Sequence, residues 1–265
     1  MEKTQSIPTI DFSDFPGQYE KLRKASEEWG CFRVVNHRIP LELMQEMKKV
    51  VRSLLDLPIE IKKNNTDVIA SSGYWAPSTK NPLYEALGLY DMASSQAVRD
   101  FCSRLEASPS QRDTIEKYAQ AINEMIMDIG GRIVESMGLN GDYCKDWPYD
   151  ENVGGLEVDK SGEFVPVDPL PGSLLVNLGD MANVWSNGRL HTVRHRVQCK
   201  EATIRVSIAT FLLGPKEATV EPPPELVDSD HPRLYKSFTY EEYRELRLST
   251  KLQAGEALAL VRTSA

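Results

Sequence analysis

The fold is decided by residues 173–213, SLLVNLGDMANVWSNGRLHTVRHRVQCKEATIRVSIATFLL. Apolar and polar residues alternate in short runs within this stretch and just upstream, with turn-forming residues between the runs: 155–158, 164–167, 173–177, 191–198 and 203–213. A period of two is typical of strands that bury one face. We therefore expect an all-β half, closed as a jelly roll or barrel.

The half before this stretch is patterned for helices instead. Apolar residues recur at spacings of three and four over 17–29, 41–56 and 109–137, and Ser108, Pro109 and Gln111 are typical of a helix start. Short strands are expected at 7–12 and 31–37, and a last helix from Thr239. Residues 64–100 are polar, broken by Gly and Pro, and rich in aromatics. That stretch predicts either pocket-lining loops or an ordinary connection.

These patterns predict one α+β domain, in which the helical half packs on the β core. Residues 1–148 are the expected helical region, 149–215 the core and 216–265 a helical tail. The chain has 265 residues and a net charge of −8, which argues against nucleic acid and anionic membranes as partners. The sequence contains no apolar run long enough to span a bilayer and no signal peptide, and its four cysteines show no metal or disulfide spacing. A cytoplasmic location is expected; the oligomeric state is not readable.

Two histidines and an Arg-x-Ser pair are the candidate site residues. His191 and His195 are four apart on one expected strand, so both face the same side and one of them is positioned to reach a metal. His37 and His231 are expected in turns or loops. Arg205 and Ser207 are two apart on the next strand, so their side chains share a face. A guanidinium with a hydroxyl beside it suits a carboxylate ligand, and a salt bridge to an internal Asp or Glu is an equally good explanation.

The linked motifs resemble those of the plant iron(II)/2-oxoglutarate-dependent dioxygenases. The resemblance covers nearly the whole chain, and its segments are NLGD (177–180), WSNGRL (185–190), HRV (195–197), RVS (205–207), IPTID (7–11), WGCF (29–32), VNH (35–37), LP (57–58) with Lys62, GGLEV (154–158) and PLPG (169–172). Within that family, a further set is similar to the subgroup of dioxygenases for auxin oxidation: NTD (65–67), NPLYE (81–85), LYDMA (89–93), HRVQCKEA (195–202) and HPRLY (231–235).

The resemblance implies a double-stranded β-helix core that uses Fe(II), 2-oxoglutarate and O2. It implies oxidation of a small aromatic acid, indole-3-acetic acid, to 2-oxindole-3-acetic acid. By the same resemblance His195 matches one iron ligand, and Arg205 and Ser207 match the pair that binds the far carboxylate of 2-oxoglutarate. His191 falls where the family tolerates other residues and is not made a ligand.

One departure from the family pattern concerns the metal. The family's other two iron ligands come from a His-x-Asp motif, and no His-x-Asp occurs in this sequence. The motif belongs between Pro148 and Asp150, where about 30 residues of strand and turn are expected. Two explanations are open: the protein lacks the segment, as a splice form or degenerate copy does, or the sequence is joined across a stretch lost from it. The alternative function is an inactive family member that binds a small acid or a partner. An unrelated β-barrel binding module fits the motif set poorly.

Overall fold

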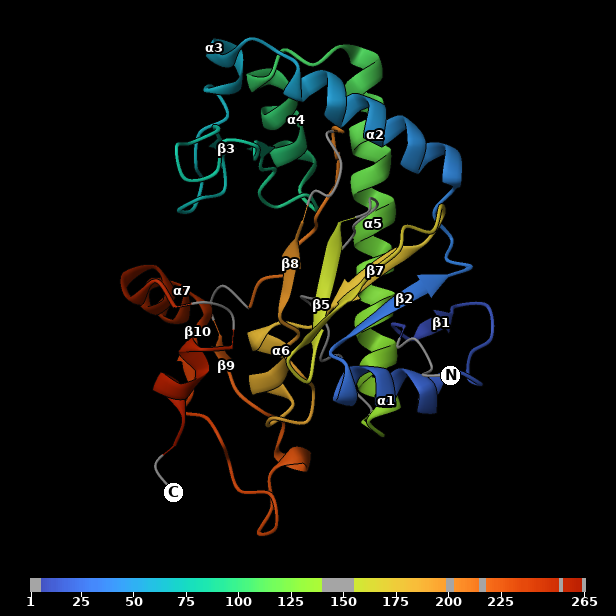
Figure 1. Cartoon of the computed structure of the whole chain (residues 1–265), viewed down its shortest axis with the longest axis vertical. Helices are drawn as coiled ribbons and strands as arrows, with labels where there is room; N and C mark the ends of the chain where they lie inside the picture. Colours follow the sequence, from blue (N-terminus) through green and yellow to red (C-terminus); the bar gives the residue numbers. More distant parts are fainter. Residues whose placement is uncertain (1–5, 140–154, 199–202, 215–217, 253–254, 264–265) are drawn as a thin grey trace. The chain divides into compact units, whose positions relative to one another are not determined.

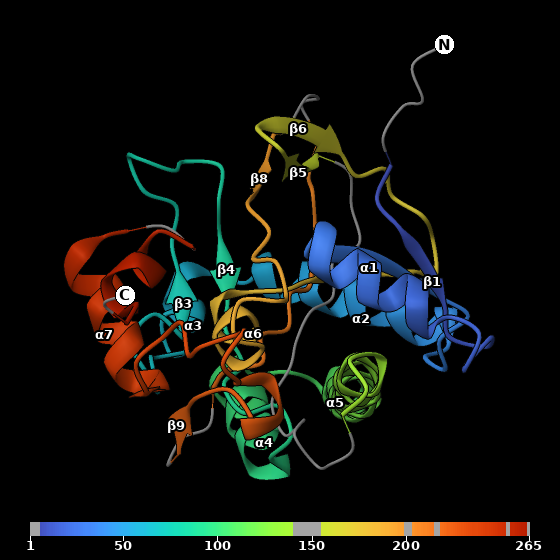
Figure 2. The ribbon, with the colours of Figure 1, turned by 90° about the horizontal axis from the view of Figure 1, so that it is seen from below.

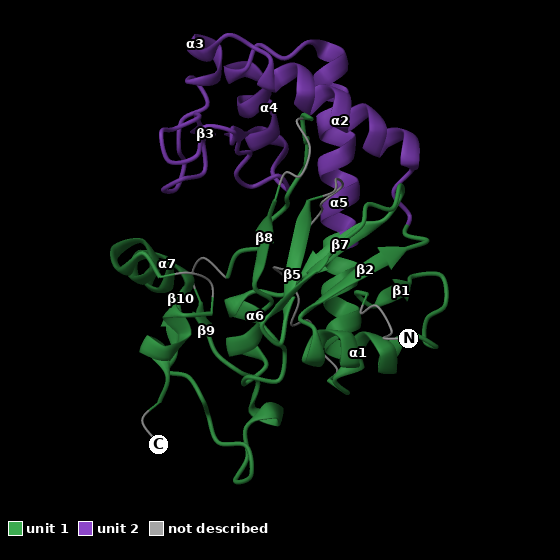
Figure 3. Ribbon diagram, in the orientation of Figure 1, with its two compact units in different colours: residues 1–37, 126–265 green, residues 38–125 purple. Residues whose placement is uncertain are grey.

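The computed structural model describes residues 6–139, 155–198, 203–214, 218–252 and 255–263. Two compact units make up the chain, one of residues 1–37 with 126–265 and the other of residues 38–125 (Figure 3). The division predicted from the sequence, into residues 1–148, 149–215 and 216–265, was based on the resemblance to the family and not on compactness. It remains a prediction.

The first unit contains two three-stranded sheets and a two-stranded ribbon (Figure 1). The first sheet has the order β1 (Thr9–Asp11), β2 (Cys31–Val35), β7 (Leu174–Asn177), with β1 parallel and β7 antiparallel to β2. The second is fully antiparallel, in the order β6 (Glu163–Pro166), β5 (Leu156–Lys160), β8 (His195–Val197). The ribbon pairs β9 (Thr219–Val220) with β10 (Phe238–Thr239).

A shared apolar core joins the two sheets. Its members come from both sheets and from the loops beside them: Ile7, Cys31, Leu156, Val158, Val167, Leu175 and Val193. Each is at most 8% exposed. Burying one such side chain stabilises a fold by about 1.5–3 kcal/mol relative to leaving it exposed. This core holds β5, and through it β8, against β7.

Helices border these sheets. The helix α1 (Tyr19–Glu28) packs against β2 and lies beside the β1–β2 side of the sheet (Figure 2). The remaining short elements of the unit are α6 (Asp180–Trp185), α7 (Tyr240–Thr250) and two 3₁₀ turns, η1 (Pro224–Leu226) and η2 (Ala257–Val261). A capping box starts α7, with Thr239 and Glu242 bonding each other's backbone amides. The long α5 (Pro109–Ser136) begins in one unit and ends in the other.

The second unit is mostly helical. It holds α2 (Leu41–Leu55), α3 (Ile59–Lys62), α4 (Ser95–Arg104) and a small ribbon of β3 (Tyr74–Trp75) with β4 (Ala86–Leu87). A polar network ties α3 to the ribbon, because Lys62 Nζ and the Tyr74 hydroxyl both donate to Glu85 Oε1, at 2.5 and 2.6 Å.

Most expected elements are confirmed within a few residues, two expected strands are shortened or absent, and α4 begins within residues 64–100, where only loops were expected. The helices predicted at 17–29, 41–56 and 109–137 and the strands predicted at 31–37 and 173–177 are present. The strand predicted at 191–198 forms only over β8. Residues 203–214, predicted as a strand to 213, have no strand assignment in the described structure. The turn predicted at 199–202 lies outside the described residues.

Candidate functional site

The strand β8 carries His195 and is held against β5 by its neighbour Arg196. His195 lies opposite Val158 in the ladder, and Arg196 lies opposite Glu157. The Arg196 guanidinium donates from Nε to Glu157 Oε2 at 2.8 Å and covers the Phe164 ring at 3.8 Å from its centroid. Glu157 is 6% exposed, so its charge needs such a partner. Arg196 therefore holds β8, the strand that carries the His195 imidazole, against β5.

The imidazole of His195 is exposed on this strand. In the part of the chain that the structure describes, no three His, Cys, Asp or Glu side chains gather as a metal site would require. The described residues thus provide His195 as a candidate ligand without a complete set of three metal-binding side chains around it.

Arg205 and Ser207 lie together as the sequence predicts. The Arg205 guanidinium donates to Ser207 Oγ at 2.9 Å, although residues 203–214 form no strand. Both residues are half-buried. A guanidinium and a hydroxyl side by side offer several donors to one anionic group, and a carboxylate accepts bidentate bonds from such a pair.

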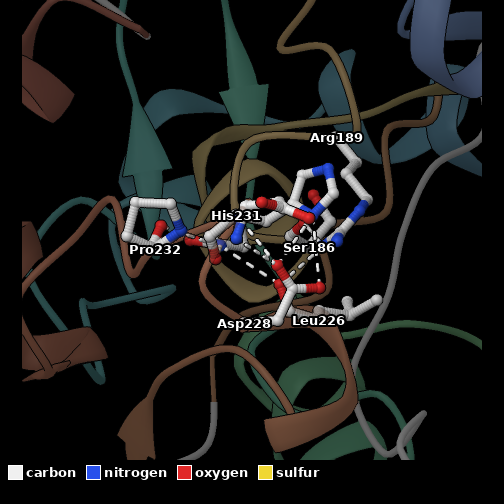
Figure 4. Close-up of polar contacts among 8 residues, drawn as sticks. Ser186, Arg189, Leu226, Asp228, His231 and Pro232 are labelled. Carbon is white, nitrogen blue, oxygen red and sulfur yellow. Dashed lines mark hydrogen bonds and ion pairs between the residues drawn. The ribbon is translucent and has the colours of Figure 1, made fainter.

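The other three histidines have structural positions. His191 lies before β8, and its backbone N–H donates to Ser26 O at 3.0 Å, against α1. Burial lowers the pKa of the His191 imidazole below its usual value, as it does for His37. His37 and His231 lie outside helices and strands, as predicted. His231 Nδ1 contacts Asp228 Oδ1 at 3.0 Å in an exposed loop (Figure 4).

The WSNGRL segment anchors this loop rather than a ligand. Arg189 donates to Leu226 O at 2.8 Å and to Ser186 O at 3.3 Å (Figure 4). Asn187 Nδ2 donates to the carbonyls of Leu226, His231 and Pro232 at 3.2–3.3 Å. These bonds satisfy carbonyls of the loop that would otherwise be buried without a donor.

Two buried polar residues of the NLGD segment escaped sequence reasoning. Asp180 accepts from the Tyr243 hydroxyl at 2.6 Å and from the Gly255 backbone at 2.8 Å, which ties α6 to the C-terminal region. Burial and the bond to Asp180 raise the pKa of Tyr243. Asn177, at the end of β7, is 3% exposed, and neither atom of its amide has a hydrogen-bond partner in the described structure. The sequence did carry a signal for Asn177, because it is a polar residue at the end of an otherwise apolar strand.

Comparison with known proteins places these residues in a family. The pattern of the 2OG-Fe(II) oxygenase superfamily matches residues 148–214, and that of the non-haem dioxygenase N-terminal region (described from morphine synthesis) matches residues 7–121. A rice protein named 2-oxoglutarate-dependent dioxygenase DAO is 47% identical over 293 aligned positions, which cover 96% of this chain and 98% of the relative. The chain belongs to the 2OG-Fe(II) oxygenase superfamily.

Solved structures agree with this membership. The crystal structure of the dioxygenase for auxin oxidation in rice superposes with a TM-score of 0.88 at 45% identity, over 97% of this chain and all of that one. The dioxygenase for auxin oxidation 1 of Arabidopsis thaliana, in a binary complex with 2-oxoglutarate, gives a TM-score of 0.81 at 49% identity, over 86% of this chain and all of that one. The cofactors of this family are Fe(II), 2-oxoglutarate and O2.

The same alignment shows that this chain is shorter inside than its relative. The 293 aligned positions exceed by about 39 the roughly 254 residues that 96% of this chain represents. Because both proteins are covered almost end to end, these positions lie within the alignment. A shortfall of this size is close to the length of the segment expected next to Pro148.

The described residues fit 2-oxoglutarate better than they fit iron. The Arg205–Ser207 pair fits a carboxylate of 2-oxoglutarate. Mononuclear non-haem iron of this kind takes two histidines and one carboxylate. No three such side chains gather among the described residues, so these residues by themselves do not fit iron.

Proposed function

We propose that this protein acts in the 2-oxoglutarate-dependent oxidation of indole-3-acetic acid to 2-oxindole-3-acetic acid, a step of auxin catabolism. The observation that carries the proposal is the 47% identity to the rice dioxygenase over 96% of the chain. Relatives named for other reactions are more distant, such as the Arabidopsis jasmonate-induced oxygenase 4 at 28% identity. Neighbours named for auxin oxidation span this chain at 45–49% identity.

In this proposal each site residue has one role. Arg205 and Ser207 bind the carboxylate of 2-oxoglutarate that lies far from the reacting end, which fixes the orientation of the co-substrate. His195 is one ligand of the iron. The core around them is a double-stranded β-helix, to which the two three-stranded sheets of the first unit contribute strands. The protein's own contribution to the reaction is to orient both acids and to exclude water from them.

The substrate assigned here is a small aromatic acid, and no nucleic acid takes part. In the described residues no helix combines the length and hydropathy that crossing a bilayer requires. We place the protein in the cytoplasm. The alternative of a family member that only binds a small acid or a partner has less support than oxidation, because curated relatives that match over most of the chain are named as dioxygenases.

The test is a product assay with two forms of the protein. One is the 265-residue chain, and the other, called the restored form, carries next to Pro148 the stretch of the rice relative that has no counterpart here. Each is incubated with Fe(II), 2-oxoglutarate, ascorbate and either indole-3-acetic acid or jasmonic acid, and products are identified by mass spectrometry. We expect 2-oxindole-3-acetic acid from at least one form and no oxidised jasmonate. Failure of both forms to oxidise indole-3-acetic acid, beside an active rice enzyme, contradicts the proposal.

A further inference from the structure

We propose that the Asn177 side chain determines the specificity of this site for an acid whose aromatic ring carries an N–H group. The amide oxygen of Asn177 accepts a hydrogen bond from that ring N–H, so the residue touches the substrate itself. This assignment rests on the function proposed above, because indole-3-acetic acid is the acid that brings the ring N–H.

The Asn177 amide is a buried polar group without a hydrogen-bond partner. Asn177 is the last residue of β7 and is 3% exposed, and no described residue bonds its Nδ2 or its Oδ1. Buried side-chain amides almost always have partners, because an unpaired one has lost its water without compensation. By contrast, Asn183 of α6 donates to Leu190 O at 2.7 Å and accepts from the Tyr235 hydroxyl at 2.6 Å. The amide of Asn177 therefore keeps its full bonding capacity for a ligand.

The strand register places this amide on the same face as the candidate site. Residues directly opposite each other in an antiparallel pair of strands share a face of the sheet. Cys31 of β2 lies opposite Asn177, and Cys31 belongs with Val158 of β5 to the core between the two sheets. Asn177 therefore faces this core. Val158 lies opposite His195, so the His195 imidazole leaves its own sheet on the core side as well.

Side chains on this face change from buried to exposed along the second sheet. Cys31 and Val158 are 0% exposed, whereas His195 is exposed and Val197 is 47% exposed. An aromatic ring that extends from His195 toward Val158 and Cys31 leaves water, which is favourable for its carbon atoms. A ring N–H that leaves water in the same way needs an acceptor. Asn177 Oδ1 is an unpaired acceptor on this face.

The two unpaired atoms of the amide indicate which kind of ligand satisfies it. Nδ2 is a donor and Oδ1 is an acceptor. The co-substrate 2-oxoglutarate is ionised at neutral pH and offers acceptors, so it would leave Oδ1 unpaired. Indole-3-acetic acid offers a ring N–H in addition to its carboxylate. Because the Arg205–Ser207 pair already supplies donors to a carboxylate, the ring N–H is the group that the Asn177 amide is suited to bind.

A comparison of two ligands tests this assignment. The compound 1-benzothiophene-3-acetic acid has sulfur where indole-3-acetic acid has N–H, so it has no ring hydrogen to donate. Anaerobic calorimetry with Fe(II) and 2-oxoglutarate gives the Kd of both acids for the 265-residue chain, the restored form and the Asn177→Leu variant of each. We expect the parent to prefer the indole at least about 10-fold, and Asn177→Leu to bind both acids within about 2-fold. A ratio of two Kd values is unaffected by a partly unfolded variant.

Thermal unfolding without ligand separates a binding role of Asn177 from a structural one. Asn177→Leu removes an amide that no described residue bonds, at nearly constant volume, so it should leave the Tm unchanged or raise it. Asn183→Leu is the matched control. Because Asn183 bonds both Leu190 and Tyr235, this change should lower the Tm by roughly 4 °C or more. A lower Tm for Asn177→Leu would mean that the amide has a structural partner, and it would contradict the assignment.

The binding results distinguish a failure of this assignment from a failure of the proposed function. If neither form binds indole-3-acetic acid, the proposed function is wrong and the assignment falls with it. If the acid binds but the parent shows no preference for the N–H, or Asn177→Leu keeps that preference, the function stands and the assignment is wrong. The amide then bonds a buried water only. Loss of the preference in Asn177→Leu, at an unchanged or higher Tm, is the result that we expect.

Discussion

At the scale of single residues, the described structure brings the Arg205 and Ser207 side chains together but gathers no group of three metal-binding side chains. Arg205 and Ser207 lie within hydrogen-bond distance of each other without a strand to align them. Their i, i+2 spacing was readable from the sequence, and so was the position of His37 and His231 outside helices and strands. The orphaned amide of Asn177 was not readable, because satisfaction of a buried group depends on distant partners rather than on local pattern.

The Arg205 side chain should dominate affinity for 2-oxoglutarate. Truncating one partner of a hydrogen-bonded charge pair typically costs about 2–5 kcal/mol, so Arg205→Ala should weaken 2-oxoglutarate binding about 30-fold or more. Arg205→Lys keeps the charge but loses the planar fork of the guanidinium. Its affinity for 2-oxoglutarate should lie between that of the parent and that of Arg205→Ala. Titration calorimetry with the restored form and 2-oxoglutarate measures all three. An unchanged Kd for Arg205→Ala would remove this residue from the site.

At the scale of elements, the junction between α1 and β2 depends on a glycine. Gly30 has φ of +65°, and a Cβ at that position would lie 2.2 Å from His191 O. The chain approaches closely here because the backbone of residue 191 bonds Ser26, and Leu178 N–H donates to Gly30 O at 2.7 Å. This contact fixes the segment that leads into β8.

Replacing Gly30 by alanine should therefore lower the free energy of unfolding by more than the left-handed backbone conformation alone would cost an alanine. A left-handed conformation costs an alanine about 1–2 kcal/mol, and Gly30→Ala adds a backbone clash. Gly138→Ala is the matched control, because Gly138 has φ of +76° with no atom near the added Cβ. Urea unfolding should show a clearly larger loss of stability for Gly30→Ala than for Gly138→Ala. Equal losses would mean that the contact with residue 191 is not rigid.

The hydrogen bonds between Lys62, Tyr74 and Glu85 in the second unit should make the free energy of unfolding depend on pH in the alkaline range. Burial and the hydrogen bond to Glu85 raise the pKa of Tyr74 from 10.0 to about 12. Above pH 10 the unfolded chain loses this proton before the folded one, so the free energy of unfolding should fall as pH rises from about 10 to about 12.

Tyr74→Phe should remove that part of the pH dependence. The stability difference between the parent and Tyr74→Phe should shrink over this interval and stay constant below it. Tyr84→Phe, in an exposed ring outside the network, is the control and should leave the slope unchanged. Denaturant unfolding at a series of pH values measures both. A parallel pH profile for the parent and Tyr74→Phe would show that the Glu85 bond does not persist in solution.

The elements that the sequence predicted well are those stabilised by local pattern. The capping box of Ser108 and Gln111 and the apolar stripe of α5 were readable, and both are present. The helix α4 was missed among polar and aromatic residues, although Ser94 caps it and Val98, Phe101 and Cys102 share its buried face. Residues 203–213 have the alternation of a strand but no strand structure. A ladder needs a partner, and alternation carries no information about whether that partner exists.

At the scale of the whole molecule, family membership and an incomplete metal site coexist. The chain matches its relatives over nearly its full length, so its core residues and loop anchors are those of a dioxygenase. The rice relative is longer within the alignment by about 39 positions, and the sequence predicts that additional strands and two ligands belong next to Pro148.

The most direct test is the coupling of two products in the restored and unaltered forms. With Fe(II), 2-oxoglutarate, O2 and indole-3-acetic acid, succinate and 2-oxindole-3-acetic acid are quantified together over time. We predict equimolar formation of both by the restored form, dependent on His195 and Arg205, and neither product from the 265-residue chain. Comparable rates from the 265-residue chain would contradict the account of the metal site, and succinate without oxidised indole-3-acetic acid would contradict the assigned substrate.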